Sequence, residues 1–300
     1  MTKNIYNCTE ANTGLFKFLS IQCSNLYYPA RIMDLSIIIT HYQTPELLDL
    51  CLDSIIKATK DIKKEIIVVD SESREDTRHL IKEKYKQVRI LPFRKNVGYA
   101  KLVNAGLRKV KGEFILILNA DIIVTENSID KMLDFLRRHP EIGIIGPRLM
   151  DFTGKIQISC FANPTLGALL ARRTILGKTR WGRKKLSEFV LNEACKKVNR
   201  PLEVDWLQGS AIMIKRCLLD KIGYLDENFF IYFEDADWCR RCWQAGKKVI
   251  YFPSAKMFHY YHRASKKWGG FLDLILNKYT RIHLISALKY FWKYRYKVKK

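Results

Sequence analysis

The sequence is short of acidic residues and has no long apolar run. Its 30 aspartates and glutamates stand against 53 lysines and arginines, which gives a formal net charge of +23. No stretch of about 18 uncharged apolar residues occurs, so we expect no membrane-spanning helix. Glycine and proline follow no period, which excludes a fibrous chain. No apolar core of about 7–15 residues follows Lys3, so we expect no secretory signal.

Glycine-rich phosphate loops are also missing. The sequence has no Walker loop, and Gly98 and Gly106 are too far apart for a G-x-G-x-x-G turn after a strand. A bound nucleotide must therefore be held in another way.

Eight cysteines are scattered along the chain, and without an export signal we expect reduced thiols in a cytoplasmic protein. Cys239 and Cys242, with His259 and His262, imitate a zinc pattern. Sixteen residues separate the two pairs and only two separate the histidines, so we expect no zinc site there.

Hydrophobic residues make up 48% of the chain, enough for a folded core. The positive charge is concentrated in two stretches. Residues 155–200 contain eleven basic and two acidic residues, and residues 263–300 contain eleven basic residues and one acidic residue. This excess predicts a polyanionic partner: a nucleic acid, an anionic membrane or a phosphorylated substrate.

The first half of the chain alternates apolar runs with helical patterns. The runs predict strands at residues 35–40, 65–70, 88–91, 113–118 and 142–145, with helices between them. Buried strands separated by helices predict an α/β fold with a mostly parallel sheet covered on both faces. The second half is less regular. It suggests two short strands around Gly209, a helix at 234–245, a strand at 248–252 and a flexible excursion at 163–200.

Polar side chains follow the predicted strands at their carboxyl ends, where open α/β sheets bind ligands. They are Thr40, Asp70, Asn119 and Asp121. Asp70 and Asp121 could instead cap the next helix. Asn119 and Asp121 also suit a hard divalent cation, to which His259 could add a nitrogen ligand or beside which it could be merely structural.

An acidic group, Glu234, Asp235 and Asp237, follows an aromatic run. It can be read as a favourable first helical turn, with Asp237 and Arg241 as an i,i+4 pair. Crowding and desolvation could equally keep one carboxylate competent as a general base.

The last stretch, residues 263–300, combines its eleven basic residues with eight aromatic ones. Apolar residues recur there every three or four positions, which is typical of a basic helix in a membrane interface. The alternative is a terminal helix packed on the domain.

Taken together, several segments resemble the family 2 glycosyltransferases with the GT-A fold, specifically the rhamnosyltransferase-like branch. They are S-I-I-I-T at 36–40, V-V-D-S at 68–71, N-V-G-Y-A at 96–100, L-N-A-D at 118–121 and, most strongly, residues 223–246, followed by P-S-A at 253–255 and His259. The resemblance covers about three quarters of the chain, from Leu35 to about Ser265. Departures are Asn119 at the first D-x-D position and Ser71 with Glu72 where the family usually has asparagine after the aspartate.

The resemblance implies site residues. Asp235 would be the general base, and Asp121 with His259 would bind Mn²⁺ or Mg²⁺. The nucleotide-sugar would be held by Thr40, Asp70, Asn96, Gly98, Asn104, Asn119 and Asp121. The acceptor or sugar would lie near Trp206, Gly209, Ser210 and Glu234.

The resemblance also implies an inverting, metal-dependent transfer of rhamnose or another hexose. The donor would be UDP- or dTDP-linked and the acceptor a glycan or lipid-linked hydroxyl in cell-surface polysaccharide synthesis. We expect an N-terminal extension (1–33), a GT-A domain (34–262) and a basic amphipathic tail (263–300) that holds the cytoplasmic enzyme on the inner membrane face. The domain divides into a nucleotide-binding half (34–150) and an acceptor-binding half (151–262) with a basic insertion (163–200).

Two other functions compete with this one. A basic nucleic-acid-binding or peripheral membrane protein without transferase activity explains the charge but not the ordered carboxylates, so we expect no nucleic-acid partner. A nucleotidyltransferase would need a glycine-rich loop, which residues 40–44 do not form.

Overall fold

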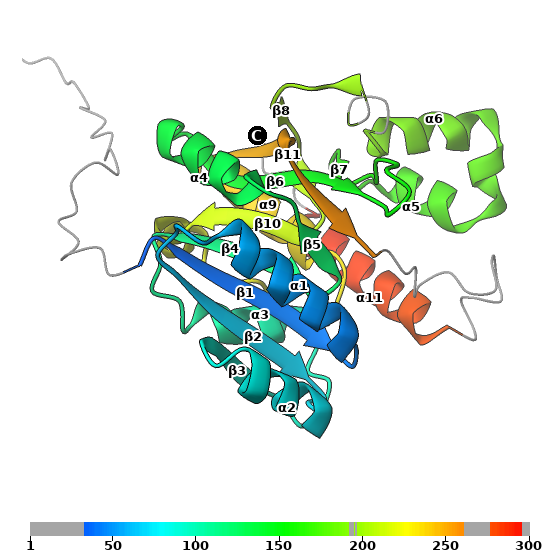
Figure 1. Cartoon of the computed structure of the whole chain (residues 1–300). Coiled ribbons are helices and arrows are strands. Elements are labelled where there is room, and N and C mark those ends of the chain that lie inside the picture. Colours follow the sequence, from blue (N-terminus) through cyan, green and yellow to red (C-terminus); the bar gives the residue numbers. More distant parts are fainter. Residues whose placement is uncertain (1–32, 192–194, 196, 261–276, 296–300) are drawn as a thin grey trace, which may run out of the picture. The chain divides into compact units, whose positions relative to one another are not determined.

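The computed structural model describes residues 33–191, 195, 197–260 and 277–295, all within one compact unit, Arg31–Lys300 (Figure 1). The predicted N-terminal extension, apart from Met33, and residues 263–276 and 296–300 of the predicted tail lie outside the described residues. The domain boundaries at those places stay predictions.

A nine-stranded sheet runs through the described residues in the order β3-β2-β1-β4-β10-β6-β11-β5, with β8 paired to β11. The strands are β1 (Leu35–Tyr42), β2 (Lys64–Ser71), β3 (Val88–Pro92), β4 (Phe114–Asn119), β5 (Ile122–Val124), β6 (Ile142–Met150), β8 (Leu202–Glu203), β10 (Ala211–Lys215) and β11 (Lys248–His259). Neighbours from β3 to β4 are parallel, as are β6 and β11, whereas β10 runs antiparallel between β4 and β6. The predicted mostly parallel α/β fold is confirmed.

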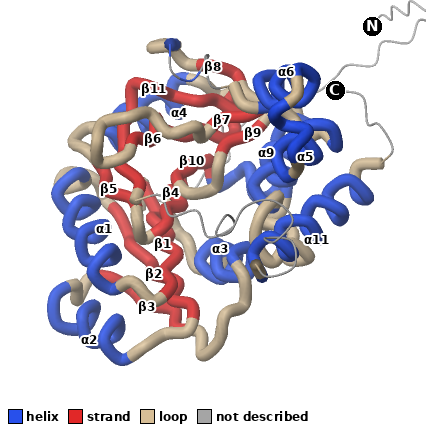
Figure 2. Tube along the Cα trace, turned by 90° about the vertical axis from the view of Figure 1, so that its right-hand side faces the viewer, coloured by secondary structure: helices blue, strands red, loops and turns tan. Residues whose placement is uncertain are grey.

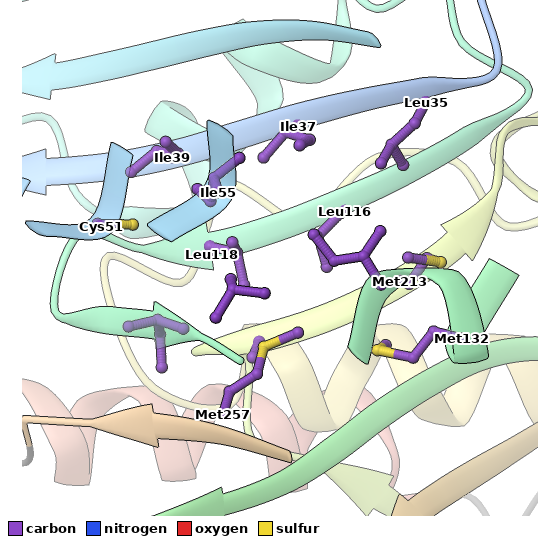
Figure 3. Close-up of a cluster of buried hydrophobic side chains, with 14 of the residues drawn as sticks. Leu35, Ile37, Ile39, Cys51, Ile55, Leu116, Leu118, Met132, Met213 and Met257 are labelled. Atoms are coloured by element: carbon purple, nitrogen blue, oxygen red, sulfur yellow. The ribbon is translucent and has the colours of Figure 1, made fainter. Parts of the chain in front are cut away.

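Helices cover both faces of the sheet (Figure 2). One face carries α1 (Pro45–Ala58), α2 (Glu75–Lys84) and α4 (Ser128–Arg138); the other carries α3 (Tyr99–Leu107), α8 (Leu219–Ile222) and α9 (Glu234–Gln244), with the short turn η2 (Arg216–Leu218). Side chains of β1 alternate between the two cores: Ile37 and Ile39 point to the first, where they meet Cys51 and Ile55 of α1 (Figure 3), and Ile38 points to the second.

The basic insertion is helical. Where we expected a flexible excursion, the structure has α5 (Leu166–Arg173), the 3₁₀ turn η1 (Ile175–Lys178) and α6 (Arg180–Phe189). Their inward positions include Ala168, Ala171 and Gly182, which are too small to give a strong hydrophobic pattern. The hairpin joins the body beside the two-stranded sheet of β7 (Cys160–Phe161) and β9 (Trp206–Leu207).

A disulfide joins Cys160 of β7 to Cys195, with their Cα atoms 6.8 Å apart. The expectation of reduced thiols is therefore wrong for this pair, because folding brings together two cysteines that are 35 positions apart in sequence. Cys51, Cys239 and Cys242 keep buried thiols.

Strand β11 is longer than predicted. Its first part pairs with β6 up to Phe252, and pairing resumes at Lys256 after a register shift. The chain between these two points forms a bulge that accommodates Pro253, which has no amide hydrogen to give to a ladder. Beyond the bulge β11 pairs with β5, and His259 lies opposite Ile122.

The helix α11 (Lys278–Lys293) packs on the domain through a face of small and polar residues, with buried Thr280, His283, Ser286, Ala287 and Tyr290. This face packs against Phe229, in the chain before α9, and against Ala236 in the first turn of α9. The predicted apolar stripe points the other way: Ile285, Leu288 and Trp292 are exposed. One face of the helix is therefore part of the fold, and the other is open.

The fully buried Asp237 fastens this helix. Its carboxylate accepts a hydrogen bond from the Tyr294 hydroxyl (2.7 Å) and contacts Lys293 Nζ (2.6 Å). The predicted i,i+4 pair with Arg241 is also present, at 2.9 Å. Burial and the neighbouring carboxylate raise the pKa of Tyr294, so its hydroxyl remains a donor.

Replacing Tyr294 by phenylalanine should lower the free energy of unfolding by about 1–3 kcal/mol, because a hydrogen bond to a buried charge is lost. Thermal or urea unfolding measures the change. The control is Trp292→Phe on the open face, where the side chain is 70% exposed and the expected change is within about 0.5 kcal/mol. Equal stability of the two variants would contradict this role for Tyr294.

Candidate active site

The carboxyl ends of β1 and β4 meet the turn between β9 and β10. Thr40 Oγ1 donates a hydrogen bond to Asn119 Oδ1 (3.1 Å), and the Asn119 amide donates to the carbonyl of Ser210 (2.9 Å). The Ser210 hydroxyl is buried and has no hydrogen-bond partner among the described residues. Three predicted site residues are thus brought together at one edge of the sheet.

Asp70, at the end of β2, is held by a histidine that the sequence reading missed. Asp70 Oδ1 lies 2.7 Å from His41 Nδ1, and both side chains are buried. The Thr44 amide donates to His41 Nε2 (3.0 Å), so Nε2 is an acceptor and Nδ1 carries the hydrogen that Asp70 accepts. The other oxygen, Asp70 Oδ2, is buried and has no hydrogen-bond partner in the part of the chain that the structure describes. It is the atom that this residue can offer to a ligand.

The loops after β1 and β2 are joined to each other. Tyr42 Oη and Gln43 Nε2 both donate to Glu72 Oε2, at 3.1 and 2.6 Å. Gln43 and Glu72 each have positive φ, 54° and 51°, a conformation that non-glycine residues rarely adopt. Such strain occurs preferentially at binding sites. Glu72, noted above as a departure from the family pattern, therefore shapes the rim beside Asp70.

Asp121 and His259 face each other, as predicted. Asp121 Oδ2 lies 3.4 Å from His259 Nε2, and the carbonyl of Asp121 accepts from the amide of Tyr260 (2.9 Å). Asp121 Oδ1 is buried, and no described residue forms a hydrogen bond with it. The pairing of β11 with β5 sets this arrangement, because it places His259 beside the residue that follows Asp121.

Gln157 orients His259, and the sequence reading missed it too. Its Nε2 donates to the carbonyl of His259 (2.9 Å), so its Oε1 must be the atom that lies 2.8 Å from His259 Nδ1. Nδ1 therefore carries a hydrogen, and the lone pair of a neutral imidazole is on Nε2, toward Asp121. A histidine held in this way is prepared for a cation.

Asp235 lies in the first turn of α9, after Tyr232 and Phe233, which both have positive φ. Its two oxygens accept from the amides of Gly209 (3.0 Å) and Ala236 (2.8 Å). Burial raises the pKa of Asp235 to about 6, although these hydrogen bonds act in the opposite direction. A carboxylate that titrates near neutrality can accept a proton in catalysis.

Glu234 is only 4% exposed, and its Oε2 has no hydrogen-bond partner within the described ranges. Burial, and then the charge of Asp235, raise its pKa well above the ordinary value. Both neighbouring carboxyl groups are buried, and burial is the largest cause that raises the pKa of each.

Tyr99 connects the two parts of the site and had no role in the sequence reading. Its hydroxyl donates to the carbonyl of Gly209 (2.6 Å). Burial raises its pKa well above the usual value, and the charges of Glu234, Asp235 and Asp121 raise it further. Tyr99 and Asp235 thus bind the same residue, Gly209, one at its carbonyl and the other at its amide.

The loop before Tyr99 touches the loop before α9. Gly98 has φ of 87°, and a Cβ there would lie 2.5 Å from the carbonyl oxygen of Phe230. Its amide donates to Asn96 Oδ1 (3.0 Å), and the next amide, of Tyr99, donates to Phe230 O (2.7 Å). Only glycine fits this close approach.

Trp206 and Asn104 have structural contacts. Trp206 Nε1 donates to Ala162 O (2.9 Å), and its ring stacks on Phe161 with centroids 4.3 Å apart. The Asn104 amide is buried and bonds to Leu225 and Glu227, so in the structure it links α3 to the chain before α9. Its predicted contact with the donor stays a prediction.

Across the described residues, no group of three or more histidine, cysteine or acidic side chains could hold a metal ion. Asp121 and His259 form a pair, which needs further ligands from a bound molecule or water. Cys239 and Cys242 lie in the hydrophobic core around α9.

One edge of this mostly parallel sheet carries a carboxylate–imidazole pair and a carboxyl group whose pKa is raised. This arrangement is typical of a group-transfer enzyme. The sequence profile of "Glycosyl transferase family 2" matches residues 36–239. The chain therefore belongs to glycosyltransferase family 2, as its motifs indicated.

Two of the curated relatives are named as sugar transferases. Over 208 residues the chain is 31% identical to N-acetylglucosaminyl-diphospho-decaprenol L-rhamnosyltransferase of Mycobacterium tuberculosis, covering 65% of this chain and 66% of that enzyme. It is 27% identical over 212 residues to the low-salt glycan biosynthesis hexosyltransferase of Haloferax volcanii, covering 69% of this chain and 61% of the relative. The chain thus spans about two thirds or less of the length of these enzymes.

Two solved structures have the same fold. GalNAc-T7 with UDP, GalNAc and Mn²⁺ superposes with a TM-score of 0.58 at 18% identity, covering 80% of this chain and 46% of that one. TarS of S. aureus superposes with a TM-score of 0.52 at 15% identity, covering 76% and 36%. The predicted GT-A fold is confirmed.

Proposed function

We propose that the protein is an inverting, metal-dependent glycosyltransferase. It transfers rhamnose or another hexose from a UDP- or dTDP-linked donor to a hydroxyl of a glycan or lipid-linked acceptor in cell-surface polysaccharide synthesis. The observation that carries this proposal is the position of Asp235. Burial raises the pKa of its carboxyl group to about 6, and its carboxylate accepts a hydrogen bond from the amide of Gly209, whose carbonyl accepts one from Tyr99.

In the proposed reaction Asp235 removes the proton of the acceptor hydroxyl. The acceptor oxygen attacks the anomeric carbon from the side opposite the diphosphate, whose bond to that carbon breaks, and the configuration inverts. Asp70 Oδ2, which has no hydrogen-bond partner among the residues that the structure describes, is available to the base or ribose of the donor.

Asp121 and His259 are the residues that would hold a divalent cation. The orphaned Asp121 Oδ1 and the His259 Nε2 lone pair give an oxygen and a nitrogen donor, which suit Mn²⁺, and the carboxylate also suits Mg²⁺. When bound, such an ion neutralises charge that develops on the leaving diphosphate. Gln157 keeps His259 in the tautomer that binds a cation.

Replacing Gln157 by leucine should weaken Mn²⁺ binding about 10- to 100-fold, because the imidazole loses the partner that fixes its orientation and tautomer. Calorimetric titration of Mn²⁺ in the presence of UDP measures this directly. Gln87→Leu, at an exposed glutamine, is the matched control and should bind Mn²⁺ as the wild type does. Unchanged affinity in Gln157→Leu would contradict the role.

The outer face of α11 supports membrane attachment. Ile285, Leu288 and Trp292 are exposed on one side of the helix, and exposed Arg281 and Lys289 lie near them in sequence. Among the described helices none is both long and apolar enough to cross a bilayer. We therefore propose peripheral association with the inner face of the membrane, where a lipid-linked acceptor would be met.

The experiment that tests the proposed function is an assay of donor hydrolysis and sugar transfer with UDP-, dTDP- and GDP-sugars in Mn²⁺ or Mg²⁺. We expect one UDP- or dTDP-linked sugar to be turned over. Absence of turnover with every donor, together with tight salt-dependent binding of an oligonucleotide, would favour the nucleic-acid alternative.

A further inference from the structure

The helical insertion exposes a group of large apolar side chains. We name Leu166, Leu170, Ile175, Leu176 and Trp181 the insertion patch. Ile175, at the tip, is 81% exposed, and Leu166 with Leu170 shares one face of α5 because they are four residues apart. Trp181 of α6 lies against α5, since its ring would be 3.4 Å from a Cβ at Gly167. Grouped exposed apolar residues of this size indicate an interaction surface.

The patch is surrounded by positive charge. Residues 166–189 contain seven basic residues and one acidic residue, Glu188, which pairs with Lys185 at 2.9 Å. The exposed cations are Arg172, Lys178, Arg180, Arg183 and Lys184. A partner must therefore accept aliphatic side chains and carry negative charge.

The insertion patch is fixed to the acceptor side of the site. Phe161, Ala168 and Phe189 form the base of the hairpin and pack on Trp206. On its other side Trp206 packs on the cluster of Phe229, Ala236 and Tyr290, which joins α9 to α11. In both views α5 and α6 lie beside α11 on the same side of the unit (Figures 1 and 2). Trp206 thus lies between two helical elements that each expose apolar and basic residues.

We propose that the insertion patch is a second membrane-docking surface, which inserts into an anionic lipid face and brings Trp206 and Asp235 to a lipid-linked acceptor. This inference rests on the proposed function. Leucine and isoleucine enter the acyl boundary of a bilayer, and the surrounding cations are attracted to anionic headgroups. Nucleic acid fits less well, because its bases stack on aromatic rings and not on Ile175 or Leu170. A second copy would bring the same positive charge to the contact.

The test is co-sedimentation of the full chain with vesicles of phosphatidylcholine containing about one third phosphatidylglycerol. Leu170→Ser with Ile175→Ser should lower the partition coefficient about tenfold or more, because two aliphatic side chains that would be buried in the bilayer are lost. The matched control, Leu50→Ser on α1, removes an equally exposed leucine (52%) and should leave binding unchanged.

A second pair of variants tests the charge. Arg183→Gln with Lys184→Gln should lower vesicle binding about tenfold or more. The control is Lys60→Gln with Lys63→Gln, at two exposed lysines in the loop between α1 and β2. It changes the net charge by the same amount and should have a small effect. Wild-type binding by both insertion variants would overturn the proposal. Equal binding to neutral vesicles, displacement by an oligonucleotide, or a dimer that Ile175→Ser dissociates would overturn it as well.

Activity separates this inference from the proposed function. The insertion variants should hydrolyse donor at the wild-type rate and lose transfer only to an acceptor embedded in vesicles. If the wild type hydrolyses no sugar donor but binds vesicles through the patch, the proposed function fails and the docking surface stands. If it transfers sugar and the insertion variants transfer to embedded acceptor normally, the docking surface fails and the function stands.

Discussion

Replacing Asp235 by asparagine will lower the rate of sugar transfer about 10²- to 10⁴-fold while the donor still binds, because the amide cannot accept the acceptor proton. The amide retains the size of the side chain and can still accept one of the two amide hydrogen bonds. Single-turnover transfer and calorimetric binding of the nucleotide measure the two effects separately. Asp220→Asn, at an exposed position, is the control and should transfer at the wild-type rate. Transfer by Asp235→Asn within a few-fold of wild type would remove Asp235 from the role.

The same residue should set the pH dependence of activity. With a pKa of about 6, Asp235 is mostly protonated at pH 5, so kcat/KM should rise tenfold per pH unit below pH 6 and level off above it. Stability changes in the opposite direction. Between the unfolded pKa near 4 and the folded value near 6 the folded chain binds more protons, so rising pH lowers the free energy of unfolding. Compared with Asp235→Asn, the wild type should therefore lose stability between pH 4 and 6.

Removing divalent cations should abolish transfer, and Mn²⁺ or Mg²⁺ should restore it. A cation on a leaving diphosphate is worth several kcal/mol, so Asp121→Ala or His259→Ala should slow transfer about 100-fold or more. Titration with Mn²⁺ in the presence of UDP should show a matching loss of metal affinity. His79→Ala, at an exposed histidine, is the control. Full activity of the wild type in excess EDTA would contradict a metal site at Asp121 and His259.

The central sheet could be predicted because its strands are continuous apolar runs. Thr40, Asn119 and Asp121 lie at or just after the ends of such runs, so the sequence predicts that they lie at one edge of the sheet. His41 and Gln157 were missed for a different reason. Their roles depend on which residue lies across from them: His41 is opposite Asp70 in the register of β1 and β2, and Gln157 reaches His259 from 102 positions away.

The two amphipathic elements show where pattern reading fails. In α11 the buried face is small and polar, and the apolar stripe is the exposed one, so hydrophobicity alone cannot tell a packed helix from a lipid-facing helix. In the insertion, the small residues Ala168 and Gly182 are buried. The large side chains of Leu166, Leu170 and Ile175 are exposed. The buried face of each element can be identified only when the surface against which it packs is known.

The number of residues in the bulge of β11 determines which way the side chains beyond it point in the site. Up to Phe252 the strand is held by β6, and His259 comes seven positions later, after the register shift that ends at Lys256. Successive side chains of a strand point to opposite faces, so losing or gaining one residue in this bulge would turn the imidazole away from Asp121 unless the bulge absorbed the change. During divergence, relatives could therefore exchange side chains around Pro253 far more freely than they could tolerate an insertion or deletion there. In an alignment of relatives, the constraint on this site should therefore be seen as a lack of gaps around Pro253, and less as conserved residue identities.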